Sequence, residues 1–107
     1  MLRDFNQGII GLNNLVLVDE NGSNLVLGHV AVGALLANLP NENIDGVEKA
    51  KRFALAMRIH GKEEAVEVTA EEVAKIKELV GKVYTTVVVG RAYDLLEQKL
   101  EEVKTSA

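Results

Sequence analysis

Residues 69–97, TAEEVAKIKELVGKVYTTVVVGRAYDLLE, decide the fold, because this stretch has the pattern of two consecutive helices. Thr69 is followed three residues later by Glu72, the spacing of a capping box, in which each side chain binds a backbone N–H at the start of a helix. Apolar residues then recur every three or four positions, which is the period of one helix face. They are Val73, Ile76, Leu79, Val80 and Val83. We expect a helix that starts after Thr69 and loosens near Gly81.

The second half of the stretch begins with TTVVV, residues 85–89, a run that either a strand or a helix could contain. β-branched residues favour strands, but the apolar positions that follow keep a helical period. Thr85 or Thr86 can cap a helix, so we expect a last helix over residues 86–103. Its apolar side chains form two overlapping rows. One row is Val88, Ala92, Leu95 and the stem of Lys99, and the other is Val89, Tyr93, Leu96, Leu100 and Val103.

This last helix carries more apolar surface than packing on one side can cover. A contiguous exposed apolar patch of more than a few hundred Å² usually marks an interaction site. We therefore expect a partner protein or a second copy of the chain to bury the remainder. The candidate partner-interface residues are Val88, Val89, Tyr93, Leu96 and Leu100.

Two further helices are expected upstream of this stretch. Residues 47–60 carry an apolar stripe, with Asp45 placed to cap the start and Gly61 placed to end the helix. The stripe consists of Val47, Ala50, Phe53, Ala54 and Met57, and we expect Phe53 to be the largest anchor of the core. Residues 29–39 have a shorter helical pattern that Pro40 ends. Gly33 weakens that helix by about 1 kcal/mol relative to Ala, so packing must support it.

The N-terminal region has the pattern of a β-hairpin. Two apolar segments, residues 15–18 and 24–27, flank Asn21 and Gly22, a pair that supplies the positive φ values of a tight turn. A third short strand is an option at residues 65–68. The sequence thus predicts an α+β fold, in which an N-terminal β-hairpin packs on three to four α-helices within a single domain, residues 1–107. The expected divisions are a hairpin region (1–27), a helical pair (28–61), a short strand or loop (62–68), a C-terminal helical hairpin (69–104) and a frayed tail (105–107).

The charge distribution disfavours nucleic-acid binding. The chain has 12 Lys and Arg against 16 Asp and Glu, a net charge of -4, and no Lys or Arg between Arg3 and Lys49. Phosphate backbones require clustered cations. The last two helices could form a helix-turn-helix, but in the last one Arg91 and Lys99 are outnumbered by acids, so a helical hairpin is the better interpretation. Those acids are Asp94, Glu97, Glu101 and Glu102.

The composition also bears on compartment. The chain has no Cys, which removes disulfides and thiolate catalysis and fits a reducing environment. No apolar run approaches the roughly 20 residues of a membrane-spanning helix. The start, MLRDFNQGII, lacks the apolar segment of a signal peptide. We expect a cytoplasmic protein without membrane association.

Patterns typical of ligand sites are weak throughout the chain. The segment DENGSN resembles the start of a calcium loop, but Gly22 is fourth from Asp19, where such a loop needs glycine sixth. His29 and His60 lack the spacing of a zinc site, and capping or surface placement explains them. Carboxylates cluster in one stretch that is better interpreted as a solvated face than as an acid–base pair: Glu63, Glu64, Glu67, Glu71 and Glu72.

No glycine-rich phosphate loop or nucleophile motif is present in the sequence. We therefore expect no enzymatic activity, no cofactor and no metal.

Three stretches together resemble small proteins encoded by tailed phages and prophages. They are LGHVAVGALLA (27–37), KAKRFALAMRIHG (49–61) and VTAEEVAKIKELVGKVYTTVVVGRAYDLLE (68–97). The similarity covers most of the chain as a pattern of apolar positions. It contains no catalytic or ligand motif, so no functional residue is carried over. The chain departs from the pattern at Thr85 or Thr86, where a proline would be expected, which leaves the start of the last helix open.

The resemblance implies a phage origin and a place among tail-morphogenesis proteins, some of which act as assembly chaperones. The expected function is therefore non-enzymatic protein–protein interaction in tail assembly. The expected partners are phage tail proteins or a second copy of the chain, in the cytoplasm of a bacterial host. The alternative is a small prophage regulatory or nucleic-acid-binding protein.

Overall fold

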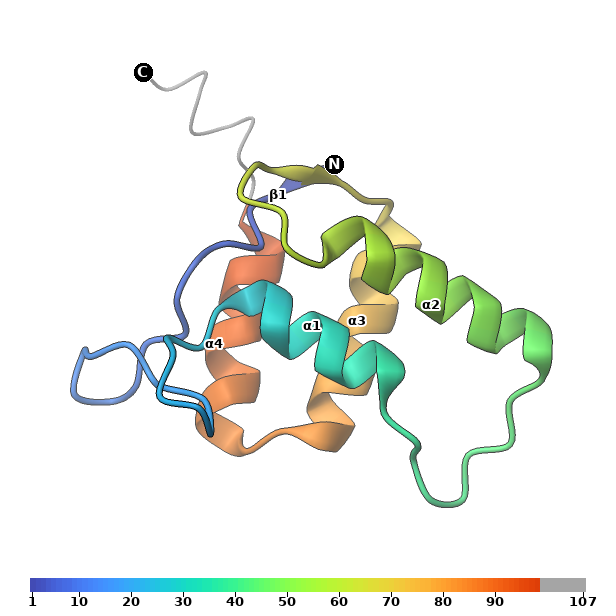
Figure 1. Cartoon of the computed structure of the whole chain (residues 1–107), viewed down its shortest axis with the longest axis horizontal. Coiled ribbons are helices and arrows are strands. Elements are labelled where there is room, and N and C mark those ends of the chain that lie inside the picture. The colour runs from blue at the N-terminus through green and yellow to red at the C-terminus, as the bar shows by residue number, and fades with distance from the viewer. Residues whose placement is uncertain (99–107) are drawn as a thin grey trace.

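The computed structural model describes residues 1–98, which form four helices and one short two-stranded sheet (Figure 1). The elements in chain order are β1 (Leu2–Arg3), α1 (Leu27–Leu36), α2 (Gly46–Ile59), β2 (Val66–Glu67), α3 (Ala70–Val83) and α4 (Thr86–Glu97). The expected α+β class is confirmed. The expected extension of the last helix to residue 103, and the expected tail at residues 105–107, lie outside the described residues.

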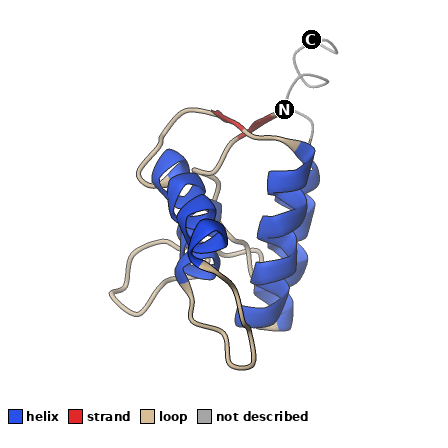
Figure 2. Cartoon of the chain, turned by 90° about the vertical axis from the view of Figure 1, so that its right-hand side faces the viewer, coloured by secondary structure: helices blue, strands red, loops and turns tan. Residues whose placement is uncertain are grey.

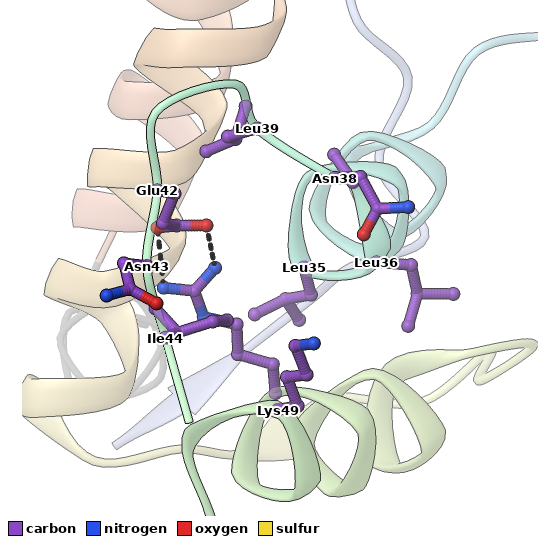
Figure 3. A pocket seen from close by; sticks show the side chains of 10 residues that line it. Leu35, Leu36, Asn38, Leu39, Glu42, Asn43, Ile44 and Lys49 are labelled. Atoms are coloured by element: carbon purple, nitrogen blue, oxygen red, sulfur yellow. Dashed lines mark hydrogen bonds and ion pairs between the residues drawn. The ribbon is translucent and has the colours of Figure 1, made fainter. Parts of the chain in front are cut away.

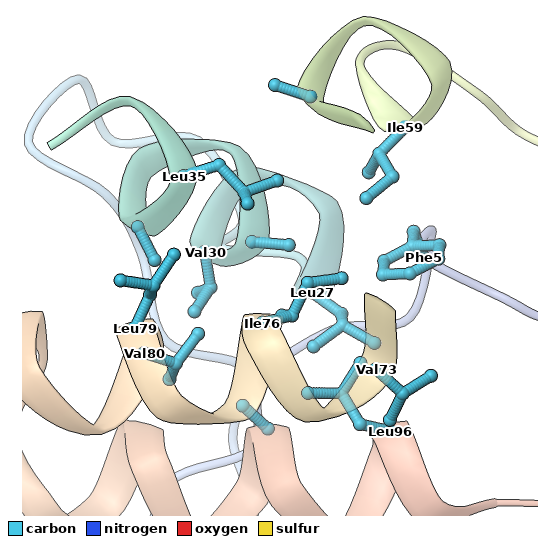
Figure 4. Close-up of a cluster of buried hydrophobic side chains, with 14 of the residues drawn as sticks. Phe5, Leu27, Val30, Leu35, Ile59, Val73, Ile76, Leu79, Val80 and Leu96 are labelled. Atoms are coloured by element: carbon cyan, nitrogen blue, oxygen red, sulfur yellow. The ribbon is translucent and has the colours of Figure 1, made fainter. Parts of the chain in front are cut away.

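Helix α1 lies at the centre of the molecule and contacts α2, α3 and α4 (Figures 1 and 2). It contains no charged residue and buries Leu27, Val30, Ala31, Ala34 and Leu35. A helix that is apolar almost all round is stable only when neighbours cover most of it. Helices α3 and α4 pack side by side and supply one wall of this core (Figure 4).

The start of α3 is a complete capping box. The Thr69 hydroxyl accepts the Glu72 N–H at 3.0 Å, and the Thr69 N–H donates to a Glu72 carboxylate oxygen at 2.9 Å. Asp45 caps α2 by accepting the Glu48 N–H at 2.9 Å. Thr85 occupies the N-cap position of α4 without a side-chain hydrogen bond. These local signals place the starts of three helices within one residue of the expected positions.

Three segments of the N-terminal region close a ring of backbone hydrogen bonds. Ile9 donates to the Leu25 carbonyl at 2.8 Å, Leu25 to the Leu17 carbonyl at 2.7 Å, and Leu17 to the Ile9 carbonyl at 2.8 Å. The three residues are eight apart. An outer set repeats the same spacing: Gly11 donates to Leu15, Asp19 to Ser23, and Leu27 to Gln7. Residues 7–27 thus contain a structural unit that recurs every eight residues around a pseudo-threefold centre.

The expected hairpin forms one side of this ring. The chain reverses at Gly22, whose φ is +82° and whose N–H donates to Asp19 at 3.0 Å. Val18 and Asn24 pair only as an isolated bridge. The ladder does not continue because the Leu17 N–H and the Leu25 carbonyl both bond to Ile9 instead of to each other. The regular sheet is instead β1 with β2, antiparallel (Figure 2). A strand within residues 65–68 is therefore confirmed, and its partner is residues 2–3.

Phe53 is not the core anchor that the sequence predicts. Its side chain is 57% exposed, whereas Phe5 is buried beside Leu27 and Ile59 (Figure 4). Helix α2 buries the opposite face, which consists of Arg52, Leu55, Ala56 and Ile59. Both faces of α2 carry apolar residues at a helical period, and periodicity does not tell which of two such faces points inward.

Candidate interaction surface

The structure places two of the five expected interface residues of α4 in the core. Val88 is 6% and Leu96 0% exposed, so neither lies on a surface of the monomer, which corrects the expectation for these two. Val89 and Tyr93 are half-buried. Leu100 lies outside the described residues. The wide apolar face of α4 therefore does not stand open.

The N-terminal segment covers the part of α4 that the sequence leaves without a neighbour. Arg3 is buried and its Nε donates to the Leu96 carbonyl. Arg91 Nε donates to the Ile10 carbonyl at 2.8 Å. Each contact joins residues more than 80 positions apart in the chain, which is why helical periodicity alone cannot predict it.

Tyr93 joins α4 to α3. Its hydroxyl donates to the Lys77 carbonyl at 2.7 Å, and the Lys77 ammonium lies 5.1 Å from the centre of its ring. The absence of a side chain at Gly81 leaves room for this hydroxyl, since a β-carbon there would lie 2.9 Å from it. Tyr93 is thus explained by packing within the chain.

The apolar face that does stand open belongs to α2. Val47, Phe53 and Met57 are 64%, 57% and 58% exposed, and Ala50 and Ala54 between them are also exposed. These five residues are called the outer face of α2 below. They span three helical turns, about 15 Å of axial length. The sequence contains this stripe in full but does not show that it faces outward.

A buried arginine fixes the inner side of α2. Arg52 donates from both terminal nitrogens to Glu42 at 2.9 Å (Figure 3). Its Nε donates to Glu48 at 2.9 Å. These hydrogen bonds are the main cause that lowers the pKa of both carboxyls. Glu42 belongs to the loop between α1 and α2, so the bidentate pair ties that loop to the helix.

The cavity beside Arg52 was considered as a ligand site. It has a volume of about 370 Å³ and is lined by the end of α1, the following loop and Lys49 (Figure 3). Three charged side chains line it, which are Glu42, Lys49 and Arg52. All three Arg52 nitrogens donate to carboxylates, so the Arg52 pairs support the orientation of α2. Lys49 is the lining cation without an ion pair among residues 1–98, and a single lysine does not make a built site.

A second exposed apolar patch lies on the N-terminal repeat. Leu12 is 90% exposed, and Leu15 and Val18 are also well exposed. Leu12 and Leu15 stand at a turn of irregular backbone and Val18 at an isolated bridge. This patch lacks the continuous three-turn stripe found on α2.

The residues weighed as ligands do not converge. His29 and His60 line one shallow hollow together with Glu63, yet no group of three or more His, Asp or Glu in residues 1–98 is placed to hold a metal ion. Glu72 is engaged in the capping box and in an ion pair with Arg58. The other carboxylates of that stretch, Glu63, Glu64, Glu67 and Glu71, are exposed.

Comparison of the chain with protein-family models, with curated proteins and with solved structures found no match. The resemblance to tailed-phage proteins therefore rests on the three quoted stretches alone. Over the part of the chain that the structure describes, no helix has the length and apolar character needed to cross a bilayer.

Proposed function

We propose that this chain is a non-enzymatic protein that acts through protein–protein interaction in the assembly of a phage or prophage tail, in the cytoplasm of a bacterial host. The single observation that supports an interaction role is the outer face of α2, where three large apolar side chains are more than half exposed on one helix. The tail-assembly setting rests on the resemblance of the three sequence stretches.

The outer face has the arrangement by which helices recognise partners. Apolar anchors at i, i+3, i+7 and i+10, which are Val47, Ala50, Ala54 and Met57, form the stripe that packs against another protein in helix-mediated recognition. Burying apolar surface stabilises a complex by about 25 cal/mol per Å² before the costs of association. Arg52 holds the inner side of α2 in place, so the outer face is presented without rearrangement.

The alternative, a regulatory or nucleic-acid-binding prophage protein, has less support. The cations of the C-terminal helices pair with carboxylates: Lys77 with Glu97, and both Lys75 and Lys82 with Glu78. Such pairs would have to open before phosphates could take their place. The described residues thus offer no cluster of unpaired cations on α3 or α4.

A pull-down against purified phage tail proteins tests the proposal. We expect the wild type to retain a tail protein, and Phe53→Asp to lose it because a buried unpaired carboxylate opposes association. Leu12→Asp is the matched control, since it places the same charge on an exposed apolar residue away from α2. Equal retention by all three proteins, or retention of no tail protein by the wild type, would refute the proposal.

A further inference from the structure

We infer that the outer face of α2 binds an amphipathic helix of a different protein, whose apolar stripe is bordered by acidic residues. This inference rests on the proposed function and adds the chemistry of the partner.

The outer face of α2 favours a helical partner over an extended one. The side of α2 offers no free backbone N–H or C=O, because these groups are paired along the helix axis. A strand laid on it would leave its own backbone groups unpaired at the contact, which is costly when they are buried. A helix satisfies its backbone internally and can pack its side chains between those of Val47, Phe53 and Met57.

The borders of the outer face are positive. Lys49 precedes Phe53 by four residues, and Lys51 follows Val47 by four, so each lies beside the stripe on its own edge. Both lysines are exposed, and neither forms an ion pair with any residue within 1–98.

The acids of the same turns are already engaged. Asp45 caps the helix, and Glu48 accepts from Arg52 on the inner side. The outer face is therefore bordered by two lysines that form no ion pair within residues 1–98, although Lys51 also attracts Glu48 at longer range. In a chain of net charge -4, a partner with acids at the matching positions would pair with both lysines.

A second copy of the chain fits this surface poorly. If two outer faces met antiparallel with Val47 opposite Met57, the Lys49 and Lys51 of both copies would gather within about 9 Å of axial length. If they met in parallel register, the Lys49 edge of one copy would lie beside the Lys51 edge of the other. Like charges at such positions repel and lower the affinity of the wrong partner.

An anionic bilayer would also attract the two lysines, but the far end of the surface opposes it. Met57 lines a hollow together with three carboxylates and two cations, of which Arg58 is paired with Glu72, so the acids outnumber Lys62, the cation there that forms no ion pair within residues 1–98. The carboxylates are Glu63, Glu64 and Glu67. A flat anionic surface in contact with the whole stripe would meet these carboxylates and be repelled. A single helix can place its acids only beside Lys49 and Lys51 and avoid the far end.

An NMR titration of the ¹⁵N-labelled full chain tests the inference. The probes are two synthetic helical peptides of about 18 residues, long enough to be helical in water, with one leucine stripe bordered by Glu in the first and by Lys in the second. We expect the Glu-bordered peptide to shift the amide signals of residues 47–57 and to bind at least about tenfold more tightly at low salt. In the double variant Lys49→Glu/Lys51→Glu this preference should reverse.

Several outcomes would overturn the inference. These are equal binding of both peptides, an unchanged preference in the double variant, or shifts that lie away from α2. Signals of residues 47–57 that depend on protein concentration alone would identify a second copy as the occupant. Their broadening by phosphatidylserine vesicles would identify a lipid surface. Because both lysines are exposed, circular dichroism should show that the double variant keeps its helices.

The two proposals can fail separately. If neither peptide binds but capture of a tail protein still depends on Phe53, the inference about partner chemistry is wrong and the proposed function stands. If Phe53→Asp captures the same tail protein as the wild type, the proposed function itself is wrong.

Discussion

The hydroxyl oxygen of Tyr84 lies 2.3 Å from the position that a β-carbon on Gly33 would occupy. This contact explains a glycine in the middle of α1, where alanine would otherwise favour the helix by about 1 kcal/mol. Tyr84 is half-buried against the core, and its burial raises the pKa of its phenol. Glycine at this position thus lowers the intrinsic stability of α1 but allows the end of α3 to pack closely against it.

We predict that Gly33→Ala lowers the free energy of unfolding by about 1–3 kcal/mol, because the methyl group overpacks the contact with Tyr84. In a Tyr84→Phe background the nearest atom would be the ring carbon Cζ at 3.5 Å, an ordinary contact distance. There the same substitution should be neutral or stabilise by up to about 1 kcal/mol. Urea denaturation of the double-mutant cycle measures the difference, and an equal cost in both backgrounds would rule the explanation out.

The two faces of α2 give a second prediction. Phe53→Ala removes a larger side chain than Leu55→Ala, but Phe53 is 57% and Leu55 4% exposed. We expect Phe53→Ala to change the free energy of unfolding by less than about 0.5 kcal/mol and Leu55→Ala to cost about 2–5 kcal/mol. Chemical denaturation of both variants checks this. A larger loss from Phe53→Ala would mean that the inner and outer faces are exchanged.

The capping box of α3 gives a third prediction. Thr69→Ala removes the acceptor for the Glu72 N–H and should cost about 1 kcal/mol. Thr69→Ser keeps a hydroxyl at the same position and serves as the control, with little change expected. Both are measured as shifts in the midpoint of urea unfolding. Equal stability of the two variants would show that the cap contributes nothing.

The Arg52 pairs predict how stability depends on pH. Hydrogen bonds from Arg52 lower the pKa of Glu42 and Glu48 below the ordinary value of 4.5, so in acid the unfolded chain takes up their protons before the folded chain does. Their contribution is therefore fully present above pH 4.5 and is lost as pH falls through the folded-state values. Urea midpoints measured between neutral pH and pH 3 should fall less in Arg52→Met than in the wild type. Parallel curves would contradict this account.

Local signals in the sequence predict most of the helical structure. Asp45 and Thr69 each provide an oxygen for the first turn of a helix, and this chemistry is contained within four residues. Gly22 and Gly61 both take positive φ where a turn and a helix end require it. Such features can be inferred from sequence because their energy comes from neighbours along the chain.

The exposed surface could not be predicted because it depends on contacts between distant residues. Leu96 is buried in the core cluster, which also contains Phe5 from the N-terminal segment and Val73 from α3. Phe53 is exposed since α1 packs on the other face of α2. The ring of backbone hydrogen bonds through Ile9 likewise joins three segments that are separated in the sequence. In each case a helical or alternating pattern identifies an apolar face but does not identify the element that packs against it.

The most direct test of the account is the affinity of the captured tail protein for three purified proteins, measured by isothermal titration calorimetry. If the outer face of α2 is the interaction surface, Phe53→Asp should weaken binding by about thirtyfold or more, the scale of a central interface residue. Leu12→Asp should bind like the wild type. Equal affinity of Phe53→Asp and the wild type would contradict the claim that this face binds the partner.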